Sequence, residues 1–368
     1  MLLMTPGPTR VPERVLGAGA RPMLHHRSSE FSAELATMLE LLSPVFGARG
    51  VILPVHATGR GAMEASICNL FSAGDEIAVC CNGRFGEMWA RLAESYGVIV
   101  HRIFTHWNQD IDPVEMAGLL DRQPVIRGVA LTCCDTSTGV ANDIEAAARI
   151  ARAHGALLLV DGVSSIGGMR FAFDDWDVDV AITASQKCLM SSPGLSFVAV
   201  SERAWAAQAR ARLPRSYWNF AEIKQAVSAT RPATPGTPPV HIVLQVAEAL
   251  RMMHEEGLER VHQRHDDMGA RARSGAAALG LSMQCPALRR FSSTVTAIAL
   301  PAGVSPNAVR DAIKARGILT AAALGPYAAT AFRIGHMGDI HPADVDRTLA
   351  ALAGALAECA STDRTGSR

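Results

Sequence analysis

The sequence predicts an α/β protein, with a large domain built on a mostly parallel sheet flanked by helices and a smaller α+β C-terminal domain. Between residues 51 and 200, short apolar runs alternate with helical patterns, and only a few residues connect them. This alternation is typical of parallel strands covered by helices on both faces. Towards the C-terminus the alternation gives way to a strand of alternating polarity and separate helices, which indicates a second unit.

Length and composition indicate a large folded protein without a charged macromolecular partner. The chain has 368 residues, 49% of them hydrophobic, and lysine plus arginine equal aspartate plus glutamate at 35 each. A neutral chain offers no basic field that would attract nucleic acid or an anionic membrane. The eight cysteines form no C-x-x-C pair, and we find neither a secretory signal nor an apolar stretch of the roughly 20 residues that span a membrane. We therefore expect a cytoplasmic protein without disulfides or a metal site.

The N-terminal segment is expected to be an arm, residues 1–20, followed by a helix. Thr5-Pro6-Gly7-Pro8-Thr9 suits neither a helix nor a central strand, and Pro12 precedes a short helical pattern. Ser28 or Ser29 can cap the next helix, whose apolar residues recur at helical spacing.

The first strand of the large domain is expected at residues 51–55. It runs into the glycine-rich turn His56-Ala57-Thr58-Gly59-Arg60-Gly61, and a helix follows to about residue 71. Such a turn places backbone N–H groups at a helix N-terminus, where anions bind readily. The turn is neither a Walker loop nor a dinucleotide-binding motif, and a turn without a ligand is the alternative.

Further strands and helices continue the alternation. Strands are expected at residues 76–81, 98–104, 125–131, 156–160, 179–184 and 197–200. In a mostly parallel sheet, ligands bind at the carboxyl ends of the strands. The residues that follow strands in this way, and that we expect to converge on one rim, are Thr58, Phe85, Thr136, Asp161 and Lys187.

Lys187 and Asp161 together suggest a cofactor. Each stands at the end of an apolar run, and the only other lysines, Lys224 and Lys314, lie in helical patterns that we expect to be exposed. A lysine can form a Schiff base with the aldehyde of pyridoxal 5′-phosphate (PLP), and an aspartate can hold the pyridine nitrogen protonated. A surface lysine and a helix-capping aspartate are the alternatives.

The C-terminal third is expected to contain an irregular stretch and then the small domain. Residues 213–240 look irregular, and a long helical pattern runs from residue 240 past Gly257 to about residue 279. A strand at residues 293–300, a helix that begins after Ser305, a strand at residues 332–334 and a last helix to about residue 356 follow. We divide the chain into the arm (1–20), a large PLP-binding domain (21–256), a small C-terminal domain (257–360) and a disordered tail (361–368).

Eight short motifs, which follow one another in order along nearly the whole chain, carry a family resemblance. They are Thr5-Pro6-Gly7-Pro8-Thr9, His25-His26-Arg27-Ser28, Thr58-Gly59-Arg60-Gly61-Ala62-Met63-Glu64-Ala65, Asn82-Gly83-Arg84-Phe85-Gly86, Asp135-Thr136-Ser137-Thr138-Gly139, Val160-Asp161-Gly162-Val163-Ser164-Ser165, Ser185-Gln186-Lys187 and Phe332-Arg333-Ile334-Gly335-His336-Met337-Gly338. With these motifs the chain resembles the class V aminotransferases, PLP-dependent transferases of fold type I typified by alanine–glyoxylate and serine–glyoxylate aminotransferases.

The resemblance implies how the cofactor ring would be held. Lys187 would carry the Schiff base and then move a proton between the substrate Cα and the cofactor C4′. Asp161 would pair with the pyridine N–H. Val163 would lie under one ring face, and Phe85 would stack on the other, as a smaller platform than the tryptophan of many relatives.

The resemblance also implies the phosphate contacts. Thr58, Gly59 and Arg60 would bind the phosphate at the helix N-terminus, and Gln186 could add a side-chain donor. Thr136 would contact the ring hydroxyl or the Schiff-base region. An arginine pointing to solvent and a turn-stabilising threonine are the alternatives for Arg60 and Thr136.

Substrate binding is assigned by the same resemblance. Arg333 would bind the substrate α-carboxylate, because a planar guanidinium matches a carboxylate with two hydrogen bonds. A structural ion pair is the alternative for this arginine. Pro6 and Gly7 of the arm would border the substrate pocket.

The relatives are homodimers with active sites shared at the interface, and this implies a contribution from a second subunit. Thr237 would donate to the phosphate of the neighbouring subunit. Thr234 replaces the aromatic residue that relatives often have, and residues 321–327 contain less glycine than in relatives. These two departures concern the phosphate contact and the acceptor side of the pocket.

The predicted function is transamination by a ping-pong mechanism, from alanine or serine to glyoxylate or pyruvate. One alternative is another PLP reaction on the same fold, such as cysteine desulfuration or β-elimination, although the setting of Cys285 does not match a desulfurase loop. Another is transamination of an aminophosphonate, pyridoxamine or a biosynthetic intermediate. A non-catalytic scaffold would require the loss of Lys187 or Asp161, and both are present.

Overall fold

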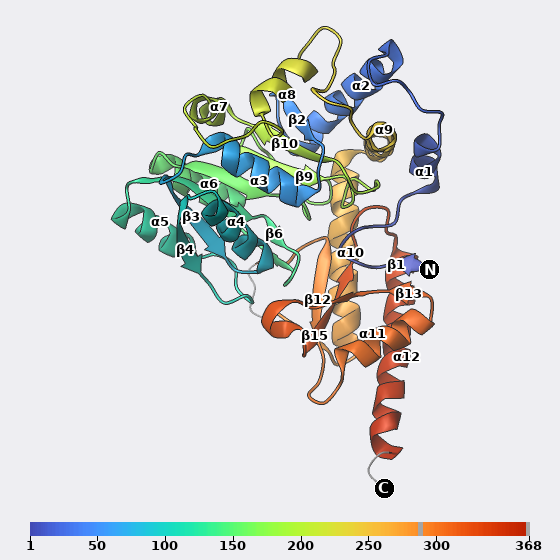
Figure 1. Ribbon diagram of the computed structural model, residues 1–368. Helices are drawn as coiled ribbons and strands as arrows, with labels where there is room; N and C mark the ends of the chain where they lie inside the picture. The colour runs from blue at the N-terminus through green and yellow to red at the C-terminus, as the bar shows by residue number, and fades with distance from the viewer. Residues whose placement is uncertain (286–289, 366–368) are drawn as a thin grey trace.

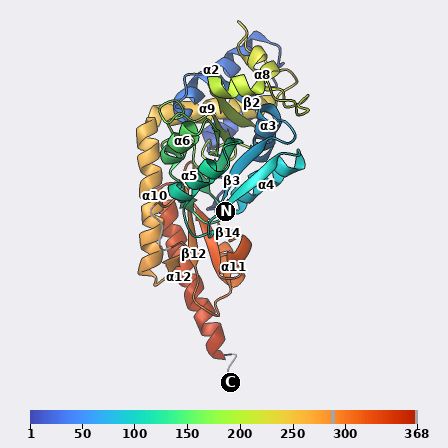
Figure 2. The same cartoon turned by 90° about the vertical axis from the view of Figure 1, so that its left-hand side faces the viewer.

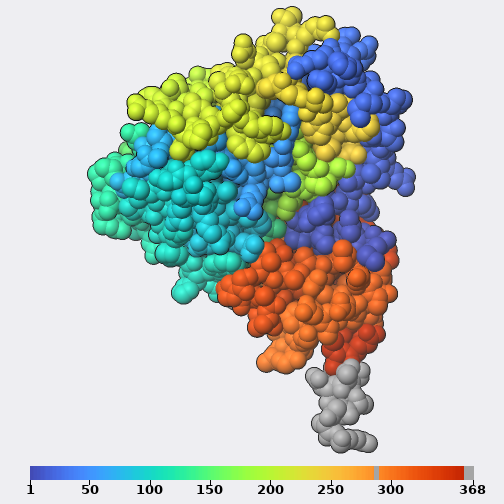
Figure 3. Space-filling model, viewed as in Figure 1, coloured from blue at the N-terminus to red at the C-terminus, as the bar shows by residue number. Residues whose placement is uncertain are grey.

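The computed structural model describes residues 1–285 and 290–365 and consists of a large and a small domain. Figure 1 shows the large domain in blue to yellow and the small domain in orange and red, with the last helix projecting away from both. In the space-filling view, the dark blue N-terminal segment lies between the two domains (Figure 3). No helix formed by the described residues is long and apolar enough to cross a membrane.

A seven-stranded sheet forms the centre of the large domain. Its order is β2 (Ile52–Val55), β10 (Ser196–Val200), β9 (Val180–Ala184), β8 (Leu157–Asp161), β5 (Ile126–Thr132), β3 (Glu76–Cys81) and β4 (Ile99–Phe104). Strands β9, β8, β5, β3 and β4 are parallel, whereas β10 is antiparallel to both of its neighbours. The predicted, mostly parallel sheet is therefore confirmed, and β2 points its carboxyl end to the same edge as β9.

Helices cover both faces of the sheet, and each face has its own apolar core. On one face lie α2 (Ser29–Phe46), α5 (Pro113–Arg122), α6 (Ile144–Ala153) and α9 (Val240–Glu256). On the other lie α3 (Gly59–Leu70), α4 (Arg84–Ser95), α7 (Glu202–Gln208) and α8 (Phe220–Val227). Residues 213–240 were expected to be irregular, but α8 forms there because Asn219 accepts a capping hydrogen bond from Ala221 N and Phe220 packs into the core.

The small domain is built on a four-stranded sheet of order β11 (Ser282–Met283), β12 (Val295–Ala299), β15 (Ala331–Gly335) and β14 (Ala321–Ala322). All of its strand pairs are antiparallel. Helices α10 (Leu258–Ala278), α11 (Pro306–Ala315) and α12 (Pro342–Thr365) pack on this sheet around Phe332. Ser305 caps α11 as predicted, with its hydroxyl accepting from Ala308 N.

Two helices end at positions that differ from those expected from the sequence. The expected helix through Gly257 is broken there into α9 and α10, because this residue adopts a φ of +89°, which the right-handed helix does not allow. Figure 2 shows α9 across the top and α10 descending beside the small domain. The last helix, α12, extends to Thr365 and not only to about residue 356, so it overlaps the predicted disordered tail. Residues 366–368 of that tail lie outside the described residues.

The N-terminal arm belongs structurally to both domains. Its first strand, β1 (Leu2–Leu3), pairs in parallel with β13 (Ile318–Leu319) of the small domain. Met4 continues this pairing, because its N–H donates to Leu319 O at 2.9 Å, and its carbonyl accepts from Gly335 N of β15 at 2.8 Å. The arm then reaches the large domain and leads into α1 (Glu13–Gly19). Residues 5–9 therefore pass between the domains.

Candidate active site

A cavity of about 160 Å³ lies at the carboxyl edge of the large sheet. It is lined by every residue that the sequence predicted to contact a cofactor within one chain: Thr58, Gly59, Arg60, Phe85, Thr136, Asp161, Val163, Gln186 and Lys187. The predicted convergence of five loops on one rim is thus confirmed. A larger hollow of about 760 Å³ lies at the opposite edge, where β3, β5 and β8 begin, but no lysine lines it.

Lys187 is buried in this cavity and its amine faces the arm. The turn after β9 places Nζ 2.5 Å from the carbonyl oxygen of Pro6 and 3.5 Å from Oγ of Ser164, and the amine donates to both. Burial lowers the pKa of Lys187 to about 8, and the negative charge of Asp161 opposes this shift. A large fraction of the amine is therefore neutral near pH 8, as a nucleophile or a general base requires.

The arm packs directly on the lysine side chain. Gly7 has a φ of +106°, and a Cβ atom there would lie 2.5 Å from Cδ of Lys187. Only glycine combines this backbone conformation with so close an approach. Thr9 holds the arm in place, since its hydroxyl donates to the Lys187 carbonyl and its N–H donates to the Gln186 carbonyl. Pro6 and Gly7 thus lie at the lysine, where the sequence placed the border of a substrate pocket.

Asp161 ends β8 and is 5% exposed. One carboxylate oxygen accepts a hydrogen bond from Val163 N at 2.8 Å. Burial, assisted by the nearby Asp135, raises the pKa of Asp161 to about 7, although the hydrogen bond from Val163 N and the charge of Lys187 oppose the rise. A buried carboxyl group with so few donors is suited to a cationic N–H partner, because such a partner would favour its charged form.

The opposite wall is the N-terminus of α3. A Cβ atom on Gly59 would lie 2.5 Å from Cγ2 of Val163, so the glycine lets the helix end approach the valine closely. The side chain of Thr58 forms no capping hydrogen bond, and the buried Oε1 of Gln186 has no partner among the described residues. Buried polar groups normally have partners. The Thr58 hydroxyl and the first N–H groups of α3 are donors, and an anionic ligand group such as a phosphate requires donors of this kind.

Sequence reasoning missed three residues of the cavity wall: Ser164, Met63 and Met88. The hydroxyls of Ser164 and Thr136 share a hydrogen bond of 2.5 Å. The predicted ring contact Thr136 is therefore linked to the lysine through Ser164. Ser164 belongs to a motif used for the resemblance, but only the folded structure shows that its hydroxyl faces Lys187.

Arg333 reaches the cavity region from β15 of the small domain and is buried. Among the described residues its hydrogen bonds go to main-chain carbonyls, with Nε donating to Ala322 O at 2.8 Å and Nη1 donating to Thr136 O at 2.6 Å. Burial lowers its pKa to about 10, and Asp135 opposes this shift. The guanidinium is held in place but not neutralised by a direct carboxylate contact, as expected of a cation that binds a substrate carboxylate.

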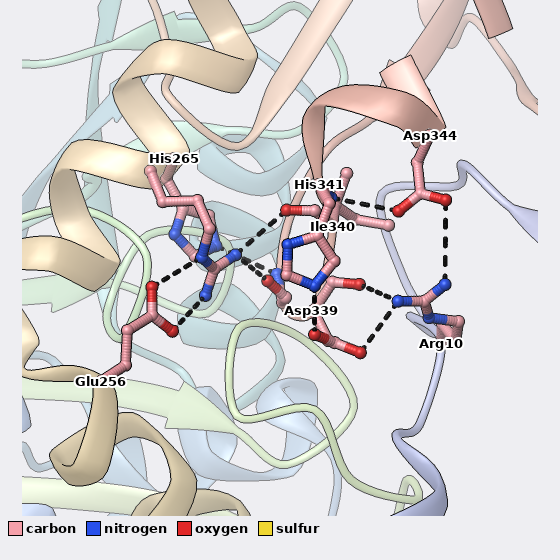
Figure 4. A network of polar contacts seen from close by, with 9 residues as sticks. Arg10, Glu256, His265, Asp339, Ile340, His341 and Asp344 are labelled. Atoms are coloured by element: carbon pink, nitrogen blue, oxygen red, sulfur yellow. Dashed lines mark hydrogen bonds and ion pairs between the residues drawn. The ribbon is translucent and has the colours of Figure 1, made fainter. Parts of the chain in front are cut away.

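A polar network fixes the segment that follows β15 (Figure 4). Arg10 of the arm forms ion pairs with Asp339, at 2.8 Å, and with Asp344, at 3.8 Å. On the other side, Gly338 N donates to Nε2 of His265 at 3.0 Å. Burial lowers the pKa of His265 to about 4, so the ring is neutral and can accept this bond. The network connects the arm, α10 and the start of α12 around the Arg333 strand.

Comparison with known proteins identifies the family. The model of the family described as Aminotransferase class-V matches residues 5–337. The chain belongs to the class V aminotransferases. It is therefore a PLP-dependent transaminase, and the prediction of cofactor and enzyme class is confirmed.

Three similar proteins illustrate the range of names in the family. The aminotransferase is 39% identical to a protein named soluble hydrogenase, small subunit, from Synechococcus sp., over 99% of this chain and 95% of that protein. It is 35% identical to L-aspartate–glyoxylate aminotransferase of Paracoccus denitrificans, over 92% and 86%. The crystal structure of pyridoxamine–pyruvate aminotransferase from Mesorhizobium loti superposes with a TM-score of 0.93 at 30% identity, covering 98% and 93%. The last comparison confirms the predicted fold class.

Thr237 is the one predicted cofactor contact that does not line the Lys187 cavity of its own chain. It lines a separate hollow of about 350 Å³ together with His56, Tyr217 and Trp218. Its segment is held by the hydroxyl of Thr234, which donates to Gly236 O at 2.7 Å. Thr237 therefore does not line the Lys187 cavity of its own chain, and its contact with the phosphate of a neighbouring subunit stays a prediction.

The raised pKa of Asp161 makes the stability of the cofactor-free aminotransferase depend on pH. The folded state binds a proton on Asp161 up to about pH 7, whereas the unfolded chain releases it near its ordinary value of 3.8. Between these values the folded state binds more protons, so stability falls as pH rises, by at most about 1.4 kcal/mol per pH unit. We expect Asp161→Asn to lose less stability than the wild type between pH 4.5 and 7.

Urea unfolding of both cofactor-free proteins across this pH range measures the difference. Asp143→Asn serves as the control, because Asp143 caps α6 away from the cavity. If the free energy of unfolding changes with pH by the same slope in the wild type and in Asp161→Asn, the pKa of Asp161 is not raised in the folded state.

Proposed function

We propose that this chain is a homodimeric transaminase that moves the amino group of a small amino acid, such as alanine or serine, to glyoxylate or pyruvate. The observation that carries the proposal is the cavity itself, in which the buried Lys187 amine lies beside Asp161. Arg333 adds a fixed cation from the small domain. The names of relatives support the acceptors, since serine–glyoxylate, L-aspartate–glyoxylate and pyridoxamine–pyruvate aminotransferases are among them.

PLP, when bound, supplies an electron sink for the charge that develops at the substrate Cα. The residues of this cavity fit the cofactor, because an amine, a buried carboxylate and a helix N-terminus face the same space. We assign Asp161 to the pyridine nitrogen and the N-terminus of α3, with Thr58, Gly59, Arg60 and Gln186, to the phosphate. Thr136 lies beside the lysine and would contact the ring hydroxyl.

Lys187 is the proton-transfer group in this proposal. Its lowered pKa would let the amine take the proton from the substrate Cα and return it to C4′ of the cofactor. The Pro6 carbonyl and the Ser164 hydroxyl hold the amine when it is not bonded elsewhere. The arm also covers the lysine and thereby limits the access of water.

Arg333 orients the substrate in both half-reactions, because donor and acceptor each carry a carboxylate next to the reacting carbon. A guanidinium that already has its Nε and Nη1 bonded presents its remaining N–H groups in a fixed direction.

The structure gives no support to desulfuration as the alternative reaction. A desulfurase needs a reactive cysteine, but Cys285 is 2% exposed and burial raises its pKa to about 12. Its thiol donates to Thr138 O at 3.5 Å. Within the described residues, no group of three or more His, Cys, Asp or Glu is placed to hold a metal ion.

A spectroscopic titration tests the proposed substrates. The PLP-loaded protein should have a visible absorption band, and alanine or serine should remove it as the amine is transferred. Glyoxylate or pyruvate should then restore the band. Tyramine, an amine without a carboxylate, serves as the control and should leave the band unchanged. A band that persists with both alanine and serine would overturn the proposed donors.

Mixing two defective subunits tests the shared site. We expect Thr237→Asp to weaken PLP binding by about 100-fold, because a carboxylate would face the phosphate. When Thr237→Asp and Lys187→Ala subunits are unfolded together and refolded, the mixed dimer contains one site with both native residues. Transamination at limiting PLP should therefore recover in the mixture. If the mixture remains as inactive as each variant, Thr237 does not act across the interface.

A further inference from the structure

The helix that carries Phe85 is capped by a distant segment of the chain. Helix α4 begins at Arg84, and its N-cap residue, Gly83, has no side chain that could bond the first N–H groups. Arg84 N instead donates to Oγ of Ser137 at 3.1 Å, and Phe85 N donates to Oδ2 of Asp135 at 3.0 Å. The first N–H groups of a helix have no partner inside the helix. Two of them find their acceptors here in Asp135, at the end of β6 (Cys134–Asp135), and in Ser137, which follows it.

Asp135 is fully buried and is bonded on both oxygens. Its second oxygen, Oδ1, accepts from Ser137 N at 2.9 Å and also from the Ser137 hydroxyl. Burial raises the pKa of Asp135, while the N–H donors of Ser137, Phe85 and Gly86 oppose the rise. A carboxylate at a helix N-terminus is also favoured by the helix dipole. The carboxylate therefore has specific partners in the first turn of α4.

Two glycines allow the close approach of these elements. A Cβ atom on Gly83 would lie 2.1 Å from Cγ of Asp135, and one on Gly86 would lie 2.2 Å from the carbonyl oxygen of Cys80. Side chains at these positions would push α4 away from the carboxylate and from β3. The Gly-Arg-Phe-Gly sequence thus brings Phe85 to the cavity wall at one fixed distance.

We propose that Asp135, assisted by Ser137, is a positioning residue that holds the ring of Phe85 against the bound cofactor. This inference rests on the proposed function in one respect, the assignment of Phe85 to a face of the cofactor ring. The residue between the two caps, Thr136, lines the same cavity, and its carbonyl accepts from Nη1 of Arg333. One three-residue segment therefore fixes the aromatic wall, a hydroxyl of the cavity and the arginine of the small domain.

The alternative is that Asp135 only stabilises α4. In that case its removal would lower the stability of the fold without a specific loss of cofactor affinity. A double-mutant cycle separates the two, because residues that act through one another have non-additive effects. The measured quantity is the dissociation constant of PLP, determined by equilibrium dialysis, which requires no catalytic turnover.

We expect Asp135→Ala and Phe85→Ala each to weaken PLP binding by about 10-fold, from the loss of the cap and of the stacked ring respectively. The double variant Asp135→Ala/Phe85→Ala should bind PLP no more weakly than Phe85→Ala alone. Asp143→Ala is the matched control, because Asp143 caps α6 through Ala146 N and does not line the cavity. It should leave the PLP dissociation constant unchanged.

Asp135→Asn and Ser137→Ala provide milder variants if Asp135→Ala does not fold. Each variant keeps one acceptor for the first N–H groups of α4, so each should weaken PLP binding by about 3-fold. In the Phe85→Ala background, neither change should weaken PLP binding further. Additive losses in either cycle, or an equal loss in Asp143→Ala, would overturn the inference. A wild type that binds PLP but transfers no amine would overturn the proposed function instead, while the cycle would still decide the role of Asp135.

Discussion

Lys187→Ala is expected to lower the rate of amine transfer by about 10⁴-fold, since it removes the proton-transfer group from the cavity. The other candidate bases that line the cavity are poorly suited, because Asp161 is expected to hold the pyridine nitrogen and Ser164 offers only a neutral hydroxyl. The rate of loss of the visible band after one addition of alanine measures the step directly. The intact mass after borohydride reduction should also show PLP attached to the wild type but not to Lys187→Ala.

Two further variants make this experiment specific. Lys187→Arg retains a cation in the same place but not an amine with a lowered pKa, so it should be as inactive as Lys187→Ala. Lys224→Ala should have wild-type activity, because Lys224 lies over the ring of Trp205 and not in the cavity. Borohydride attachment that persists in Lys187→Ala would assign the covalent bond to another lysine and contradict the central role of Lys187.

Arg333→Leu is expected to lower kcat/KM by about 10²–10³-fold for every substrate with an α-carboxylate. Truncation removes the cation that would pair with the carboxylate in a largely buried site. It also leaves the carbonyls of Ala322 and Thr136 without their donor. Both half-reactions should suffer, because the amino donor and the oxo acid present the same carboxylate to the same side chain.

Steady-state kinetics with the donor and the acceptor varied in turn measure this effect. Arg333→Lys should recover only part of the activity, since an ammonium group cannot form the same pair of parallel hydrogen bonds. Arg271→Lys is a matched control in the small domain, because Arg271 forms an exposed ion pair with Asp346. A loss confined to one half-reaction would show that Arg333 binds a group other than the α-carboxylate.

The sequence predicts the local elements and the rim of the cavity well, for a physical reason. Strand and helix periodicity follows from which side chains must be buried, and parallel strands bring their carboxyl ends to one edge. Thr58, Phe85, Thr136, Asp161 and Lys187 therefore converge because they follow strands of one sheet. Their position at one edge of the sheet can therefore be predicted without knowing any individual contact.

Contacts between distant segments could not be predicted in this way. The helical pattern through Gly257 does not reveal the break, because the apolar spacing continues on both sides and a glycine can either continue a helix or adopt the φ of +89° found here. The Pro6 carbonyl accepts a hydrogen bond from Lys187, and this contact depends on where the folded chain holds the arm. The cap that Asp135 provides for α4 is equally invisible in the sequence, since a local cap would be sought at Gly83.

The arm also constrains the order in which this molecule can be completed during synthesis. Leu2 and Leu3 are synthesised long before their strand partners, Ile318 and Leu319. Such non-local pairing forms late, because a very long loop must close before the contact is made. The ribosome therefore releases the large domain before β1 can pair with β13. A chain that stops short of residue 318 would keep the contacts of Thr9 with Gln186 and Lys187 but would lack the strand pairing that holds the start of the arm.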